Sequence, residues 1–234
     1  MMVYVLIDKI VVIDLETTDT NECIGAIVEV GVCELDLKTG ETTKLLDSII
    51  SENIFGKSHH DAWIFQNSSL TVDNIHKYGV SWHLIKQDLQ KILNKYPITA
   101  YNKQFDFKFL RHRRLDIKSE LPCPMKVATH ILKLPSHYGG YPYGGYKWPS
   151  FQEAWDYYNP DSDYIETHRA YDDAYHEALL IYDMYQKGDY TILDEIKSMN
   201  CKDCRNTTCT IAGVNNDLNN KCPRYVGSVH YGSK

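Results

Sequence analysis

The chain has 234 residues, of which 43% are hydrophobic and 24% charged, and its formal net charge is −6. This apolar content is enough to bury one full core, and about 180 residues fit a single α/β domain. No run approaches the ~20 apolar residues of a membrane span, and Asp8 and Lys9 interrupt the apolar start that a signal sequence would need. We therefore expect a soluble, cytoplasmic protein.

Strands are expected first along the chain. Apolar and β-branched residues predict them at Ile10–Leu15, Ala26–Leu37 and Thr42–Ile50, with a turn at 38–40 that makes the last two antiparallel. Helical spacing follows at 68–78 and again at 81–96, where one apolar stripe begins behind the N-cap candidate Ser81.

Strand and helix patterns alternate in the second half of the domain. The expected elements are a strand at Ile98–Tyr101, helices near Phe105–Arg113 and Met125–Leu132, a capping box at Ser150–Glu153, and a helix from Thr167 to Gln186. Thr167 is the expected N-cap of the last helix. Three meandering strands followed by alternation indicate a mixed sheet flanked by helices.

Four acidic residues and one histidine form the candidate active site: Asp14, Glu16, Asp106, His168 and Asp173. Asp14 and Glu16 lie two apart on an expected strand, so their side chains point to the same face. Carboxylate oxygens are the ligands that Mg²⁺ or Mn²⁺ prefers, and two such ions can hold both reacting oxygens of a phosphodiester. A neutral imidazole suits proton removal from water. The pattern therefore indicates two-metal phosphodiester hydrolysis.

The order of these motifs, DxE, then NxxxD, then HxxxxD, resembles that of the DEDDh, or DnaQ-like, 3′–5′ exonucleases over roughly residues 8 to 188. The resemblance implies a ribonuclease H-like fold, metal ligands at the four acidic positions and a general base at His168. A related group has tyrosine four residues before the last aspartate, where this chain has Arg169, so the histidine variant is favoured. Asp172 adjoins Asp173, and the five-residue spacing from His168 favours Asp173.

Nucleic-acid contacts are expected beside these motifs. Thr17, Asn102 and Lys103 adjoin the first two motifs, and five basic residues gather around the second: Lys103, Lys108, Arg111, Arg113 and Arg114. They either contact backbone phosphates or form a solvated helix face. The sequence YGGYPYGGY places Tyr141 and Tyr143 in a glycine-rich loop, where they either stack on unpaired bases or pack back on the domain.

Cysteines concentrate in the C-terminal tail, at Cys201, Cys204, Cys209 and Cys222. Four thiols with this spacing can close a tetrahedral Zn²⁺ site, which would help a short segment to fold. An iron–sulfur cluster, disulfides and free thiols are the alternatives. We expect an exonuclease domain at 1–188 and a small Cys-rich appendage at 189–234.

The expected function is metal-dependent removal of nucleoside 5′-monophosphates from the 3′ end of DNA, with two Mg²⁺ or Mn²⁺ ions. The alternatives are trimming of RNA 3′ ends and a non-catalytic nucleic-acid-binding or polymerase-accessory module. The expected partner is nucleic acid with a free, single-stranded or frayed 3′ end. A proofreading role would require a polymerase or another replication or repair protein.

Overall fold

The computed structural model describes residues 7–136 and 145–192, and Asp8–Ile192 form one compact unit. The strands are β1 (Lys9–Thr17), β2 (Ile27–Asp36), β3 (Thr42–Ser51), β4 (Val80–Ser81) and β5 (Ile98–Thr99). The helices are α1 (Trp63–Asn67), α2 (Val72–Tyr78), α3 (Trp82–Lys95), α4 (Lys103–His112), α5 (Pro124–Leu132), α6 (Phe151–Tyr158) and α7 (Ala170–Gln186), with a 3₁₀ turn η1 at Lys57–His59. None of the described helices has the length and apolar content to cross a membrane.

The strands form one five-stranded mixed sheet in the order β4-β3-β2-β1-β5. Strands β1, β2 and β3 are an antiparallel meander, whereas β5 runs parallel to β1 and β4 runs parallel to β3. This arrangement confirms the predicted mixed sheet flanked by helices. The turn before β3 contains Gly40, whose φ of 76° suits glycine at this position.

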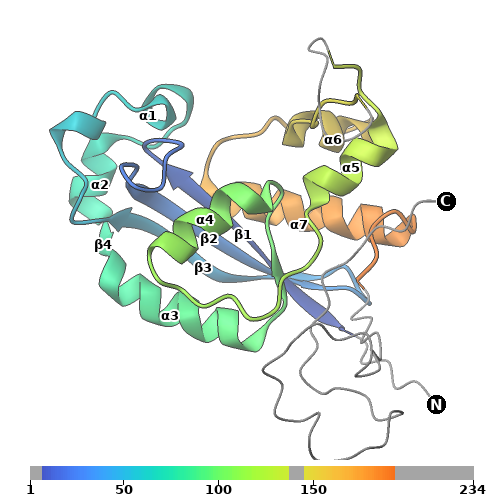
Figure 1. Cartoon of the computed structure of the whole chain (residues 1–234), viewed down its shortest axis with the longest axis horizontal. Helices are drawn as coiled ribbons and strands as arrows, with labels where there is room; N and C mark the ends of the chain where they lie inside the picture. Colours follow the sequence, from blue (N-terminus) through green and yellow to red (C-terminus); the bar gives the residue numbers. More distant parts are fainter. Residues whose placement is uncertain (1–6, 137–144, 193–234) are drawn as a thin grey trace, which may run out of the picture. The chain divides into compact units, whose positions relative to one another are not determined.

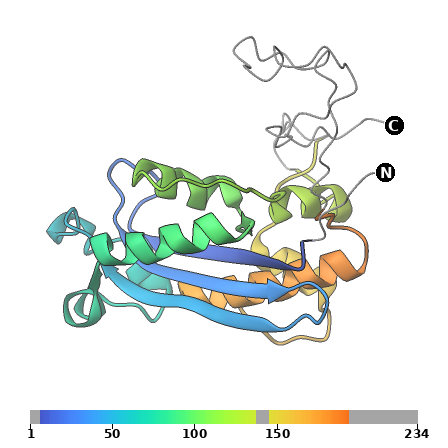
Figure 2. The same ribbon diagram turned by 90° about the horizontal axis from the view of Figure 1, so that it is seen from below.

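Helices cover both faces of the sheet (Figures 1 and 2). Helix α7 lies along one face, where it contacts β1, β2 and β3, and α3 and α4 lie on the other. Alternate residues of β1, Val11, Ile13 and Leu15, point toward α3 and α4 and join the main hydrophobic core, in which Leu89 and Phe109 are fully buried. The intervening residues of β1 therefore face α7, and these include Asp14 and Glu16.

The first turn of α7 rests directly on the backbone of β2. A Cβ atom on Gly31 would lie 2.1 Å from the carbonyl oxygen of Ala170, so no larger residue fits there. Gly31 is paired with Asp14 in the β1–β2 register. This close approach sets the N-terminus of α7 beside the carboxylates of β1.

Several element boundaries differ from the predictions. Helix α7 begins at Ala170 with Arg169 as N-cap, so the prediction that Thr167 caps it is wrong. His168 adopts a φ of 53°, which a right-handed helix cannot contain, and the helix must start after it. The expected helix 68–78 starts only at Val72, behind a capping box formed by Thr71 and Asn74. The capping box at Ser150 and Glu153 is confirmed.

Candidate active site

Strand β1 brings two carboxylates to the end of the sheet where α7 begins. Asp14 pairs with Gly31 and Glu16 pairs with Glu29 in the antiparallel register, so all four positions face the same side. Burial, followed by the charges of neighbouring carboxylates, raises the pKa of Asp14 and of Glu16 well above their usual ranges. The predicted common face of Asp14 and Glu16 is therefore present.

Asp106 lies in the first turn of α4, with an exposed fraction of 3%. Its Oδ1 accepts a hydrogen bond of 3.1 Å from the backbone N–H of Leu15, so the carboxylate ties α4 to β1 beside Asp14. Burial raises the pKa of Asp106 to about 8. The hydrogen bonds that its carboxylate accepts from backbone N–H groups act in the opposite direction and offset part of this rise.

Asp173 lies in the first turn of α7 and is 4% exposed. Its Oδ2 accepts from the backbone N–H of Arg169 at 3.1 Å, and its Oδ1 accepts from the Tyr164 hydroxyl at 3.1 Å and the Thr167 N–H at 3.4 Å. The loop that carries His168 is therefore bonded to Asp173 on both sides of the histidine. Burial raises the pKa of Asp173.

His168 points its ring toward the carboxylates. Single ligand atoms of Glu16, His168 and Asp173 all lie within 4.8 Å of one another. The His168 ring meets that of Trp63 edge-on, with centroids 4.8 Å apart, although Trp63 is 58% exposed. The structure thus brings together residues from β1, α7 and the preceding loop that are separated by more than 150 positions in the sequence.

Arg169 anchors the residue next to His168. Its guanidinium donates three hydrogen bonds of 2.6–3.1 Å to the carboxylate of Glu29, which is 1% exposed and also accepts from the backbone N–H of Ala170 at 3.0 Å. These bonds raise the pKa of Arg169. We call this bidentate ion pair between Arg169 and Glu29 a fork. Because Glu29 lies opposite Glu16 on the sheet, the fork fixes the loop that carries His168 to strands β1 and β2.

The sequence reasoning missed further acidic residues at this site, and Glu177 is the most deeply placed. It is 5% exposed, and its Oε2 accepts from the backbone N–H of Tyr101 at 3.0 Å. Burial and the charge of Asp106 raise its pKa well above the usual range. The sequence feature that could have identified Glu177 is its position four residues after Asp173, which places both on the same face of the helix. Glu166, in the loop before His168, has its pKa raised by burial and Asp173 to about 7.

Asp173 and Asp172 have different environments. The Asp172 side chain is 40% exposed and accepts from the hydroxyls of Tyr164 and Thr167, at 3.0 Å and 2.8 Å. Asp173 is buried and belongs to the group that converges with Glu16 and His168. The structure therefore places Asp173, and not Asp172, among the candidate ligands.

The donor set fits a divalent cation. Asp14, Glu16, Asp106 and Asp173 supply oxygen ligands, and burial raises the pKa of each because it opposes the ionised form. The charges of neighbouring carboxylates raise the pKa of Asp14 and Glu16 further. A hard divalent ion supplies the missing positive charge and accepts the same oxygen atoms. Among the described residues, no lysine or arginine forms an ion pair with any of these four carboxylates.

The structure describes three of the residues expected to contact nucleic acid, Thr17, Asn102 and Lys103. The Thr17 hydroxyl donates to the carbonyl oxygen of Asp19 at 2.9 Å, and Asn102 is exposed at the N-cap of α4. The Lys103 ammonium donates to the carbonyl of Leu121 at 2.6 Å and lies 3.3 Å from Glu120, so it already has partners. Tyr141, Tyr143 and the four tail cysteines lie outside the described residues.

No protein-family model and no curated protein matches the sequence. Solved structures do match. A full-length 3′-exonuclease superposes with a TM-score of 0.61 at 16% identity, over 82% of this chain and 65% of that one. The nuclease domain of 3′hExo, described as a DEDDh family member and bound to rAMP, gives 0.55 at 17% identity, over 81% of this chain and 97% of that domain.

Exonuclease I of E. coli in complex with a dA16 oligonucleotide matches with a TM-score of 0.54 at 14% identity, over 76% of this chain and 41% of that one. The matched region thus spans less than two thirds of the full-length 3′-exonuclease and of exonuclease I. At these identities the likeness shows the fold alone: this chain shares the α/β fold of these solved exonucleases.

Proposed function

We propose that this protein is a metal-dependent 3′–5′ exonuclease that releases nucleoside 5′-monophosphates from the 3′ end of a nucleic acid strand. The observation that carries the proposal is the convergence of Glu16, His168 and Asp173 within 4.8 Å. Asp14 and Asp106 adjoin this group, because Asp14 lies two residues before Glu16 on the same face of β1 and Asp106 accepts a hydrogen bond from the backbone N–H of Leu15. The fold shared with 3′-exonucleases supports the same reading.

Each residue has a chemical role in this proposal. Asp14, Glu16, Asp106 and Asp173 hold two divalent ions, and S. pombe Pop2p, another fold match, was solved in a Mg²⁺- and Mn²⁺-bound form. When bound, such ions supply positive charge to the scissile phosphate and the leaving oxygen. His168 takes the proton from the attacking water. The Trp63 ring and the Arg169–Glu29 fork hold that imidazole in place.

DNA is the first substrate that we propose, and RNA is the alternative. The matched structures include a complex with a deoxyadenosine oligonucleotide and one with a ribonucleotide monophosphate. The remaining rival, a non-catalytic binding module, is disfavoured because all five chemistry-bearing positions are filled and three of them, Glu16, His168 and Asp173, converge within 4.8 Å.

The test is degradation of matched 5′-labelled DNA and RNA oligonucleotides with Mg²⁺. We expect a ladder that shortens from the 3′ end and the release of nucleoside 5′-monophosphates. EDTA should stop the reaction, and a 3′-phosphate should retard it. Asp14→Asn should abolish activity, whereas the matched control Asp47→Asn, in a surface pair with Lys44, should retain it. Nucleoside 3′-monophosphate products, or cleavage within a circular strand, would contradict the proposal.

The Cys-rich tail stays a prediction from sequence. We propose one structural Zn²⁺ held by Cys201, Cys204, Cys209 and Cys222. Metal analysis of the purified chain should find zinc that is lost in a Cys204→Ser, Cys209→Ser variant. An absence of bound zinc in the unmodified protein would remove the proposal without affecting the exonuclease assignment.

A further inference from the structure

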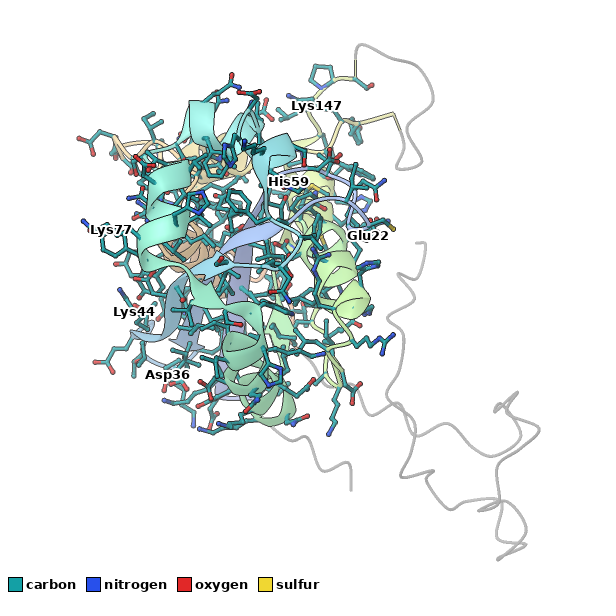
Figure 3. The ribbon with its side chains drawn as sticks, turned by 90° about the vertical axis from the view of Figure 1, so that its left-hand side faces the viewer. Glu22, Asp36, Lys44, His59, Lys77 and Lys147 are labelled. Carbon is teal, nitrogen blue, oxygen red and sulfur yellow. The ribbon has the colours of Figure 1, made fainter. Side chains whose placement is uncertain are left out.

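A cavity of about 440 Å³ lies outside the acidic site. Its walls are the loop after β1, the segment after β3, the start of α3 and the end of α4. Glu22, labelled in Figure 3, belongs to the loop wall. None of the five candidate catalytic residues lines this cavity. Its volume falls within the range of about 300–1,000 Å³ that is typical of ligand sites.

The cavity carries two positively charged side chains that pair with no other residue in the described part of the chain. Its lining contains three cationic residues and two carboxylates, of which Arg113 and Glu52 bind each other at 2.8 Å. The side chains of Lys86 and Arg114 have neither a hydrogen bond nor an ion pair with any other described residue. The second lining carboxylate, Glu22, lies 3.7 Å from Lys108, which is not part of the lining.

This arrangement contrasts with the rest of the basic cluster around the second motif. Lys103 and Arg111 pair with Glu120, Lys108 lies near Glu22, and Arg113 pairs with Glu52. The predicted phosphate contacts of this cluster therefore concern mainly Arg114, the one member without a partner among the described residues. In a chain with a net charge of −6, two unpaired cations at one cavity indicate an anionic ligand.

The walls of the cavity are preformed. The Arg113 side chain is 7% exposed, and it donates to the carbonyl oxygens of Glu22 at 2.6 Å and Gly25 at 2.5 Å as well as to Glu52. Glu52 in turn accepts from the backbone N–H of Ile27 at 2.8 Å. These bonds fix the loop 18–26, which leaves the active site directly after Glu16 and Thr17, against the cavity. One short loop thus adjoins both places.

We propose that this cavity binds a backbone phosphate of the substrate strand, on the 5′ side of the nucleotide being removed, through Lys86 and Arg114. The proposal rests on the proposed exonuclease function, because such an enzyme holds the 3′ end at the carboxylates while the rest of the strand must leave across the protein surface. Trp82 and two histidines, His83 and His112, also line the cavity, and aromatic side chains are the type on which bases stack.

The experiment measures kcat and KM on a series of single-stranded oligonucleotides that share one 3′ sequence and differ in length. The test variant is Lys86→Ala, Arg114→Ala. The matched control is Lys38→Ala, Lys91→Ala, which removes two surface lysines that pair with Asp8 and Asp88. Circular dichroism and thermal unfolding verify that both variants fold.

We expect the test variant to raise KM about tenfold on long strands and to leave kcat and the KM of a dinucleotide unchanged. The salt dependence of binding to long strands should become shallower in this variant, while the control behaves like the unmodified protein. Equal KM values for the two variants at every length would overturn the proposal. AMP serves as a probe for a free nucleotide: AMP binding that requires Lys86 and Arg114, without any effect of strand length, would overturn the strand assignment.

A failure of the proposed function gives a different result. If the unmodified protein cleaves no strand, fluorescence anisotropy with intact labelled oligonucleotides in EDTA still compares the two variants. Weaker binding by the test variant alone would then support the cavity, and equal binding would overturn it.

Discussion

The fork between Arg169 and Glu29 should contribute to stability and catalysis in separable ways. The change Arg169→Met removes three hydrogen bonds from a carboxylate that is 1% exposed and leaves it only the N–H of Ala170. Breaking a buried ion pair costs about 3–5 kcal/mol because the remaining charge stays buried. Since the Arg169 side chain is 34% exposed, we expect the lower end of that range, about 3 kcal/mol.

The same change should also lower kcat. His168 precedes Arg169 and holds a φ of 53°, a left-handed conformation that costs on the order of 1 kcal/mol for a residue other than glycine. Without the fork, the loop can relax and move the imidazole away from Glu16 and Asp173. A displacement of about 1 Å at a catalytic group lowers rates by up to about 10².

Urea unfolding and steady-state kinetics on two variants separate these effects. The double variant Arg169→Met, Glu29→Met leaves no unpaired buried charge, so it should recover at least half of the lost stability. It should not recover kcat, because the loop is still unanchored. A single variant destabilised by less than about 1 kcal/mol would refute the buried-charge reasoning. Full recovery of kcat in the double variant would show that Arg169 acts on folding alone.

Three further predictions concern the acidic site. His168→Ala should reduce kcat by about 10²–10⁴ and leave Mn²⁺ binding measurable by calorimetry, and near-normal turnover would contradict its role as the base. Glu177→Gln keeps an acceptor for the Tyr101 N–H but removes a buried ionisable group. It should therefore stabilise the metal-free protein by on the order of 1 kcal/mol and weaken Mn²⁺ binding. A lower stability of this variant in EDTA would refute the reasoning. In EDTA, stability should fall by roughly 1 kcal/mol per pH unit between about pH 5 and pH 8, because the pKa of Asp106 is raised to about 8 and the folded state binds more protons in this window. The pKa values of Glu34, Asp36 and Glu153 are lowered, so these groups do not contribute to the fall in stability within this pH window. Saturating Mg²⁺ should flatten this fall, and urea unfolding at a series of pH values measures it.

The candidate site residues could be picked out from the sequence because each occupies a local pattern. Alternation on β1 places Asp14 and Glu16 on one face, and the spacing of the last motif separates Asp173 from Asp172. The supporting residues carry no such signal. Glu29 lies within a strand whose other residues are almost all buried and apolar, and only the pairing of β1 with β2 shows that it opposes Glu16.

The errors at element ends have a common physical cause. Side chains compete with the helix for backbone hydrogen bonds, and sequence alone does not show which contact is made. The Thr167 hydroxyl bonds to Asp172, and the Thr167 N–H bonds to Asp173, so Thr167 stays in the loop and Arg169 becomes the N-cap. The partners of the basic cluster were equally hidden. Arg113 pairs with Glu52, which follows β3 and is distant in sequence, and Arg111 pairs with Glu120, which lies in the irregular segment after α4.

Two arginine–glutamate forks hold the loops that border the candidate site. Arg169 binds Glu29 in β2 and fixes the loop before α7, and Arg113 binds Glu52 after β3 and fixes the loop after β1. Both glutamates are almost fully buried, and each also accepts a backbone N–H. The sheet and these forks therefore hold the carboxylates of the site together against their mutual repulsion. Divalent ions bound by these carboxylates should relieve the repulsion and raise the stability of the domain.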